Sequence, residues 1–113
     1  MRFFYFSTMK NVNDFLDATY LKTPEQANIS KLENDTVVDE LLQNAVKNKY
    51  KCVMIRPEYV ATAKQYLVKN KSKVLVGTVI DFPEGIADLQ EKLSQAQLAI
   101  DNGADDLDFV IDY

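Results

Sequence analysis

The sequence contains no histidine, a single cysteine (Cys52) and only three glycines among its 113 residues. One cysteine cannot form an internal disulfide, which favours a reduced, cytoplasmic setting. Without histidine, the chain cannot assemble a thiolate or imidazole metal site, nor a Ser/His/Asp or Cys/His nucleophile arrangement. Gly77 and Gly85 stand alone, so the phosphate-binding glycine loops are also missing. We therefore expect no metal and no cofactor.

Arginine is scarce and long apolar runs are absent. The net charge of -4, the pI near 4.7 and only two arginines argue against nucleic acid as a partner. The lysines at 47, 49, 51, 69, 71 and 73 are interpreted as solvated helix ends and connections.

Residues 1–6 are apolar but too short for a membrane span, so we expect no membrane partner. Residues 1–14 are predicted to be an amino-terminal extension and residues 15–113 a single domain.

Strand and helix patterns alternate along that domain. Short apolar runs predict strands at residues 16–21, 52–55, 74–80 and 107–111. Helical periodicity predicts helices over residues 35–48, with Asp35 or Thr36 as the cap, and over residues 57–69. A third helix ends at Gly103, and its apolar stripe comprises Ile86, Leu89, Leu93, Ala96 and Ile100. Residues 23–34 are predicted to be a loop with at most one helical turn.

This order contains no hairpin signal and is typical of an α/β fold with a parallel sheet and helical crossovers. Four strands fit an open sheet or half of a closed eight-stranded barrel, and the pattern alone does not distinguish the two. Strands at the two edges would lack partners, so we expect a homo-oligomer.

Asp108 interrupts the apolar run of the last strand, where a buried carboxylate needs a partner or a task. Asp17 lies in the first predicted strand. Function in parallel α/β folds gathers at the carboxyl ends of strands. Two carboxylates converging there from neighbouring strands would suit proton transfer. The alternatives are a solvated strand end for Asp108, a helix amino-terminal cap or a polar strand end for Asp17, and ordinary strand packing for Thr19 and Thr78.

Three segments together resemble one enzyme family. They are residues 17–22 (DATYLK), 78–85 (TVIDFPEG) and 102–111 (NGADDLDFVI), and residues 54–57 (MIRP) are similar to the exit of that family's second strand. The family is deoxyribose-phosphate aldolase, and the resemblance covers its amino-terminal half. It implies the first half of a TIM (β/α)8 barrel with about four strands.

The resemblance also implies a function. Deoxyribose-phosphate aldolases cleave 2-deoxy-D-ribose 5-phosphate reversibly to D-glyceraldehyde 3-phosphate and acetaldehyde through a lysine Schiff base. Asp108 matches the family's proton-relay aspartate and Asp17 an aspartate near the same relay. Thr19 and Leu21 match residues at the substrate end. The predicted substrate-binding residues are Thr19, Leu21, Met54 and Thr78.

The chain departs from the family pattern at three points. Asp81 replaces the usual Gly or Asn before Phe-Pro, which adds negative charge near the mouth. Met54 occupies a position that some relatives fill with Cys. The Schiff-base lysine and the phosphate-binding strands of the family are not present. We therefore expect this chain to be inactive alone, and the alternative is a non-catalytic half-barrel that self-associates.

Overall fold

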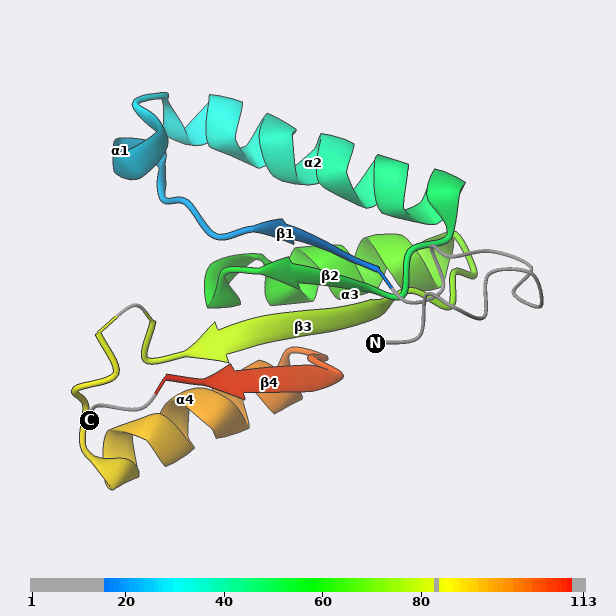
Figure 1. Cartoon of the computed structure of the whole chain (residues 1–113). Coiled ribbons are helices and arrows are strands. Elements are labelled where there is room, and N and C mark those ends of the chain that lie inside the picture. Colours follow the sequence, from blue (N-terminus) through cyan, green and yellow to red (C-terminus); the bar gives the residue numbers. More distant parts are fainter. Residues whose placement is uncertain (1–15, 83, 111–113) are drawn as a thin grey trace, which may run out of the picture.

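The computed structural model describes residues 16–82 and 84–110. Four parallel strands form one sheet in the order β1-β2-β3-β4, and helices connect them (Figure 1). The elements are β1 Asp17–Tyr20, α1 Pro24–Ala27, α2 Lys31–Asn48, β2 Cys52–Ile55, the short helix η3 Pro57–Tyr59, α3 Val60–Lys69, β3 Leu75–Ile80, α4 Leu89–Asp101 and β4 Asp106–Phe109. The predicted alternation of strand and helix is thereby confirmed.

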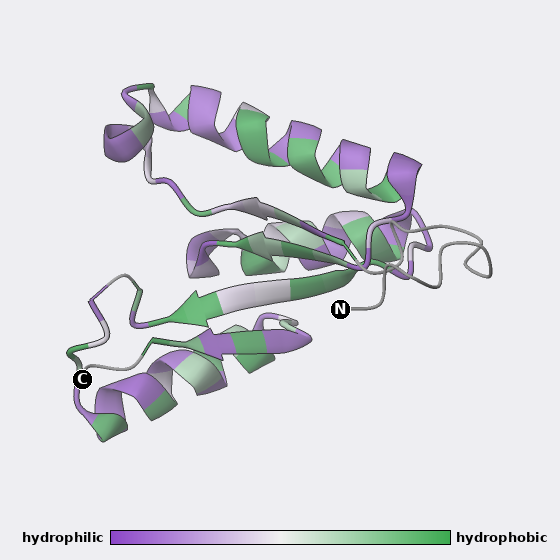
Figure 2. Cartoon of the chain, in the orientation of Figure 1, coloured by the Kyte–Doolittle hydropathy of each residue, from purple (hydrophilic) through white to green (hydrophobic). Residues whose placement is uncertain are grey.

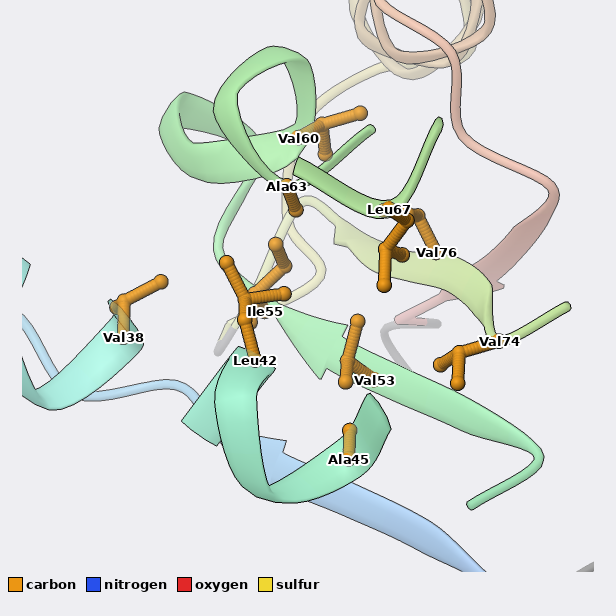
Figure 3. Close-up of a cluster of buried hydrophobic side chains, with 10 residues drawn as sticks. All are labelled: Val38, Leu42, Ala45, Val53, Ile55, Val60, Ala63, Leu67, Val74 and Val76. Carbon is orange, nitrogen blue, oxygen red and sulfur yellow. The ribbon is translucent and has the colours of Figure 1, made fainter. Parts of the chain in front are cut away.

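The main core lies between the sheet and helices α2 and α3. Val53, Ile55 and Val76 point from the strands toward this layer and are fully buried. Leu42 from α2 and Leu67 from α3 meet them (Figure 3). Fully burying a side chain of this size contributes roughly 1.5–3 kcal/mol, so this layer holds β1, β2 and β3 together.

The start of α2 differs from the prediction. The helix begins at Lys31 rather than near Asp35, because Ser30 and Glu33 form a capping box in which each side chain bonds the other's backbone N–H. Thr23 and Gln26 cap α1 in the same way. The single helical turn allowed within residues 23–34 is therefore α1, and the remainder of that segment joins α2.

The large side chains of the apolar stripe of α4 are exposed. Leu89 is 72%, Leu93 52% and Ile100 53% accessible, whereas the small Ala96 and Ala99 pack against Ile80 of β3. Figure 2 shows hydrophobic residues along α4 at the margin of the sheet. The periodicity correctly predicted a helix, but no described element covers most of its apolar face.

The amino-terminal extension predicted for residues 1–14 lies outside the described residues. Within residues 16–82 and 84–110, no helix is both long and apolar enough to cross a membrane.

Candidate active site

The face of the sheet opposite the helices carries most of the predicted site residues. Paired residues of neighbouring strands project to the same side, so the register defines this inner face. It consists of Asp17, Thr19, Cys52, Met54, Leu75, Gly77, Val79, Asp106 and Asp108. The alternate residues of the same strands face the helices.

Asp108 lies on β4 opposite Val79, one residue before the strand ends. Its side chain is exposed. Within the described residues, it has no ion pair and accepts no hydrogen bond. A carboxylate at the carboxyl end of a parallel strand, with its oxygens uncommitted, is free to exchange a proton with a bound group.

Asp17 lies at the other end of the face. It is the first residue of β1, pairs with Cys52, and is exposed. Because β2 and β3 separate β1 from β4, the expectation of carboxylates on neighbouring strands is wrong. Three strand spacings amount to about 14 Å across a flat sheet, and the four-residue offset in register adds about 13 Å along it. Asp17 and Asp108 therefore do not form a direct pair in this sheet.

Thr19, Met54 and Gly77 form one row across the middle of the inner face. Met54 is 7% exposed. A Cβ at Gly77 would overlap the Met54 sulfur and approach Cys52 Sγ to 3.1 Å. Glycine at position 77 thus allows Met54 to lie over β3, and the pairing of β1 with β2 places Met54 beside Thr19.

Leu21 and Phe82 close the carboxyl end of this face. Both pack against the buried cluster of Cys52, Met54 and Val79. The Leu21 carbonyl also accepts a hydrogen bond from Arg56 Nη1 at 3.4 Å. Leu21 therefore lies at the end where the resemblance places the substrate.

Thr78 is not brought together with the other predicted site residues. It is fully buried on the helix-facing side, and its hydroxyl donates a 2.7 Å hydrogen bond to the Ile55 carbonyl. A β-branched residue bonded to the neighbouring strand is the alternative that the sequence left open.

A network of hydrogen bonds around Lys92 and Asp81, which the sequence did not predict, supports the carboxyl end of β4. Lys92 Nζ donates to the carbonyls of Gly85 at 3.0 Å and Val110 at 3.1 Å, and it lies 3.9 Å from Asp81 Oδ2. Asp81 Oδ2 also accepts from the Ala87 N–H at 2.6 Å. The Lys92 and Asp81 side chains are only 16% and 13% exposed. The charge of Asp81, expected near the mouth, is therefore used to fix the loop between β3 and α4.

Cys52 is not a nucleophile in this arrangement. Burial raises the pKa of its thiol to about 12, and the charges of Asp17 and Asp106 act in the same direction. A thiol with this pKa stays protonated near neutral pH and is unreactive. Within the described residues, no group of three or more Cys, Asp and Glu side chains could hold a metal ion.

The chain is similar to known aldolases in sequence and in fold. It is 39% identical over 103 residues to a deoxyribose-phosphate aldolase of Metamycoplasma hominis, an alignment covering 91% of this chain and 43% of the relative. A candidate deoxyribose-phosphate aldolase of Coccidioides immitis superposes with a TM-score of 0.72 at 33% identity, covering 91% of this chain and 38% of that one. The tetrameric deoxyribose-phosphate aldolase of Aeropyrum pernix gives 0.69 at 27% identity, covering 88% and 38%.

No family model matches the sequence. The chain spans less than half the length of the curated relatives that it matches. The four strands and their helices correspond to part of the barrel of these enzymes. By sequence and by fold, the chain is therefore a relative of the deoxyribose-phosphate aldolases.

Proposed function

We propose that this chain supplies the proton-transfer side of an aldolase active site acting on 2-deoxy-D-ribose 5-phosphate. The reaction is the reversible cleavage to D-glyceraldehyde 3-phosphate and acetaldehyde. Asp108 carries the proposal, because it is an uncommitted carboxylate on the inner face at the carboxyl end of β4. Next to a lysine Schiff base, such a carboxylate passes a proton to and from the carbon and oxygen atoms that react.

The lysine itself is proposed to come from outside the described residues. Among residues 16–82 and 84–110, no lysine belongs to the inner face. Lys92 is engaged by the carbonyls of Gly85 and Val110, and Lys64 pairs with Asp105 at 3.1 Å. We therefore propose that the 113-residue chain is inactive alone and that its site is completed by the part of the fold that only the longer relatives span.

Thr19, Leu21 and Met54 are proposed to contact the substrate from the inner face. Their placement supports this role, since Met54 lies beside Thr19 and Leu21 packs against the same cluster. The substrate contact predicted for Thr78 would require its hydroxyl to leave the Ile55 carbonyl.

A chimera tests the proposed function. This chain is joined to the segment of the Metamycoplasma hominis relative beyond the matched 103 residues, and cleavage of deoxyribose 5-phosphate is measured. We expect activity in the chimera. General acid-base catalysis contributes about 10²- to 10⁴-fold, so Asp108→Asn should lower kcat by at least a hundredfold with little change in KM.

Asp39→Asn is the matched control, because Asp39 is an exposed aspartate on α2, away from the inner face. It should leave kcat within twofold of the parent chimera. Equal losses in the two variants, or full activity in Asp108→Asn, would contradict the assigned role.

Borohydride trapping tests the proposed inactivity of the chain alone. The 113-residue chain is incubated with deoxyribose 5-phosphate and reduced, and the intact mass is measured. We expect no mass shift. A stable adduct on any lysine of this chain would mean that it contains its own nucleophile.

Self-association is a second candidate function, and the exposed apolar face of α4 favours it. Leu89 and Leu93 are 72% and 52% exposed, and within the described residues β1 and β4 each pair on one side only. We expect a homo-oligomer at micromolar concentration by sedimentation velocity. Leu89→Lys with Leu93→Lys should give a monomer, whereas Leu32→Lys, at an equally exposed leucine on α2, should not. A monomeric parent chain would refute this alternative.

The cellular setting remains part of the proposal. A buried, protonated Cys52 fits a cytoplasmic protein, because it needs no disulfide partner.

A further inference from the structure

Two connections at the amino ends of β2 and β3 share one sequence pattern. Residues 46–51 read VKNKYK and residues 68–73 read VKNKSK, so they differ at a single position. The first connects α2 to β2 and the second connects α3 to β3. We call the four lysines at 49, 51, 71 and 73 the basic cluster.

The backbone holds the two connections in the same conformation. Lys49 and Lys71 have φ values of 56° and 52°, the left-handed conformation that ends a helix. The next residue in each case bonds back to the helix, Tyr50 N–H to the Ala45 carbonyl and Ser72 N–H to the Leu67 carbonyl. Each connection therefore leaves its helix through an equivalent backbone turn.

The sheet places the two connections next to each other. The Leu75 N–H donates a 2.9 Å hydrogen bond to the Lys51 carbonyl, which continues the pairing of β2 with β3. In Figure 1 the carboxyl ends of α2 and α3 lie at the same end of the sheet as the starts of these strands. This end is opposite to the carboxyl end where Asp108 and Leu21 lie.

Charge along the chain is strongly asymmetric. Residues 41–80 contain eight of the thirteen Lys and Arg residues but only one of the seventeen Asp and Glu residues. Within the described residues, no ion pair involves the basic cluster. An overall acidic chain thus holds uncompensated positive charge in one place.

A cavity of about 660 Å³ lies between the two connections. Its lining includes all four lysines of the basic cluster together with Tyr50 and Ser72. Tyr50 is half-buried against the core, and within the described residues its hydroxyl has no hydrogen-bond partner. The volume is within the range of about 300–1,000 Å³ that is typical of small-ligand sites.

Helix ends explain only some of these lysines. Lysine near a helix carboxyl end is favourable by roughly 0.3–1 kcal/mol, and this accounts for Lys49 and Lys71. Lys51 and Lys73 follow after the helices have ended, and they repel the other two across the same cavity. Four like charges around one cavity are favourable when an anion occupies it.

We propose that the basic cluster binds a small polyanion that carries two or more phosphate groups. Phosphate is a compact anion that lysine ammonium groups bind as point charges, and one phosphate can engage each pair of lysines. A small ligand is favoured over nucleic acid or a membrane because the positive charge is confined to one cavity in a chain with net charge -4. An extended polyanion would also meet the acidic remainder of the surface.

Inorganic tripolyphosphate is the probe, with monophosphate for comparison. Calorimetric titration of the full 113-residue chain at low salt should give at least tenfold tighter binding of tripolyphosphate. Raising the salt to 0.5 M should weaken that binding by tenfold or more, since the contacts are exposed and screened. Lysine acetylation of the unaltered chain, read by mass spectrometry, should show protection at the basic cluster but not at Lys22 or Lys31.

Lys49→Asn with Lys71→Asn is the diagnostic variant, because asparagine tolerates the left-handed conformation. Its Kd for tripolyphosphate should rise at least tenfold. Lys22→Gln with Lys31→Gln removes the same charge at the far end of α2, about 27 Å away along an 18-residue helix, and should change Kd less than twofold.

Three results would overturn the proposal. The first is equal weakening in the two variants, and the second is no protection of the basic cluster in the unaltered chain. The third is tighter binding of a single-stranded oligonucleotide or of anionic phosphatidylserine vesicles than of tripolyphosphate at the same salt. That result would assign the cavity to a macromolecule or a membrane.

Discussion

The buried amide of Asn34 links three elements, and its removal gives a quantitative test of the structure. Asn34 is fully buried on α2. Its Oδ1 accepts from the Tyr20 hydroxyl at 2.6 Å, and its Nδ2 donates to Tyr59 Oη at 3.1 Å and to the Lys22 carbonyl at 3.4 Å. Asn34→Ala therefore removes the hydrogen bonds that join α2 to the end of β1 and to η3.

The magnitude follows from the partners left behind. A typical hydrogen bond contributes a net of about 1 kcal/mol, and a buried group left without a partner costs about 1–3 kcal/mol. Tyr20 would lose its acceptor, whereas the Tyr59 hydroxyl would still donate to Asp35 at 2.7 Å. Alanine regains up to about 0.7 kcal/mol of helix propensity. We expect Asn34→Ala to lower the free energy of unfolding by about 2 kcal/mol.

Urea denaturation followed by circular dichroism measures this loss. Asn44→Ala is the control, because Asn44 is an exposed asparagine on the same helix, and it should be neutral or slightly stabilising. A double-mutant cycle of Asn34→Ala with Tyr20→Phe should give a coupling energy of about 1 kcal/mol. If Asn34→Ala and Asn44→Ala had the same stability within about 0.5 kcal/mol, the buried network would not exist as described.

Three further measurements test the loop after β3, the buried thiol of Cys52 and the start of α2. Gly85 has a φ of 72°, and a Cβ there would lie 2.6 Å from Val110 Cγ1. Gly85→Ala should therefore lower the free energy of unfolding by at least the roughly 1–2 kcal/mol that a left-handed conformation costs a residue with a Cβ, as measured by urea denaturation. Cys52, with a pKa of about 12, should react with iodoacetamide at pH 8 at least a hundredfold more slowly in the folded chain than in urea. Hydrogen bonds from Tyr59 and then Lys31 lower the pKa of Asp35. The stability that Asp35 contributes is therefore present above its usual pKa and is lost as the pH falls through the pKa of the folded state. When the free energy of unfolding is measured against pH, Asp35→Asn should reduce its decrease at acid pH.

The strands were predictable because their apolar runs are short and continuous. Residues 52–55 were predicted as a strand and form β2 with the same bounds. The start of α2 was missed because the polar composition of residues 23–34 concealed two capping boxes, one of them at Ser30 and Glu33. Those boxes are local sequence signals, so the early start of α2 could have been predicted.

Other features depend on what packs where, which local patterns do not encode. The stripe of α4 has helical spacing whether or not anything covers it, so periodicity could not indicate that Leu93 is exposed. The contact of Lys92 with Val110 joins residues 18 apart in sequence. It forms only because the loop after β3 folds back, and Gly85 allows that approach.

The inner face illustrates the same limit for function. Alternation predicts that Asp17 and Thr19 share one side of β1, but the strand order decides how far they lie from Asp108. Under the proposed function, Asp17 and Asp108 lie three strand spacings apart and cannot share a proton directly, so the reacting group would lie between them, over the row that includes Gly77. Gly77 contributes no side chain to that row, and the side chains of Met54 and Cys52 on β2 limit the space above it. A lysine that reached this row from outside the described residues would lie between Asp108 on β4 and Asp17 on β1.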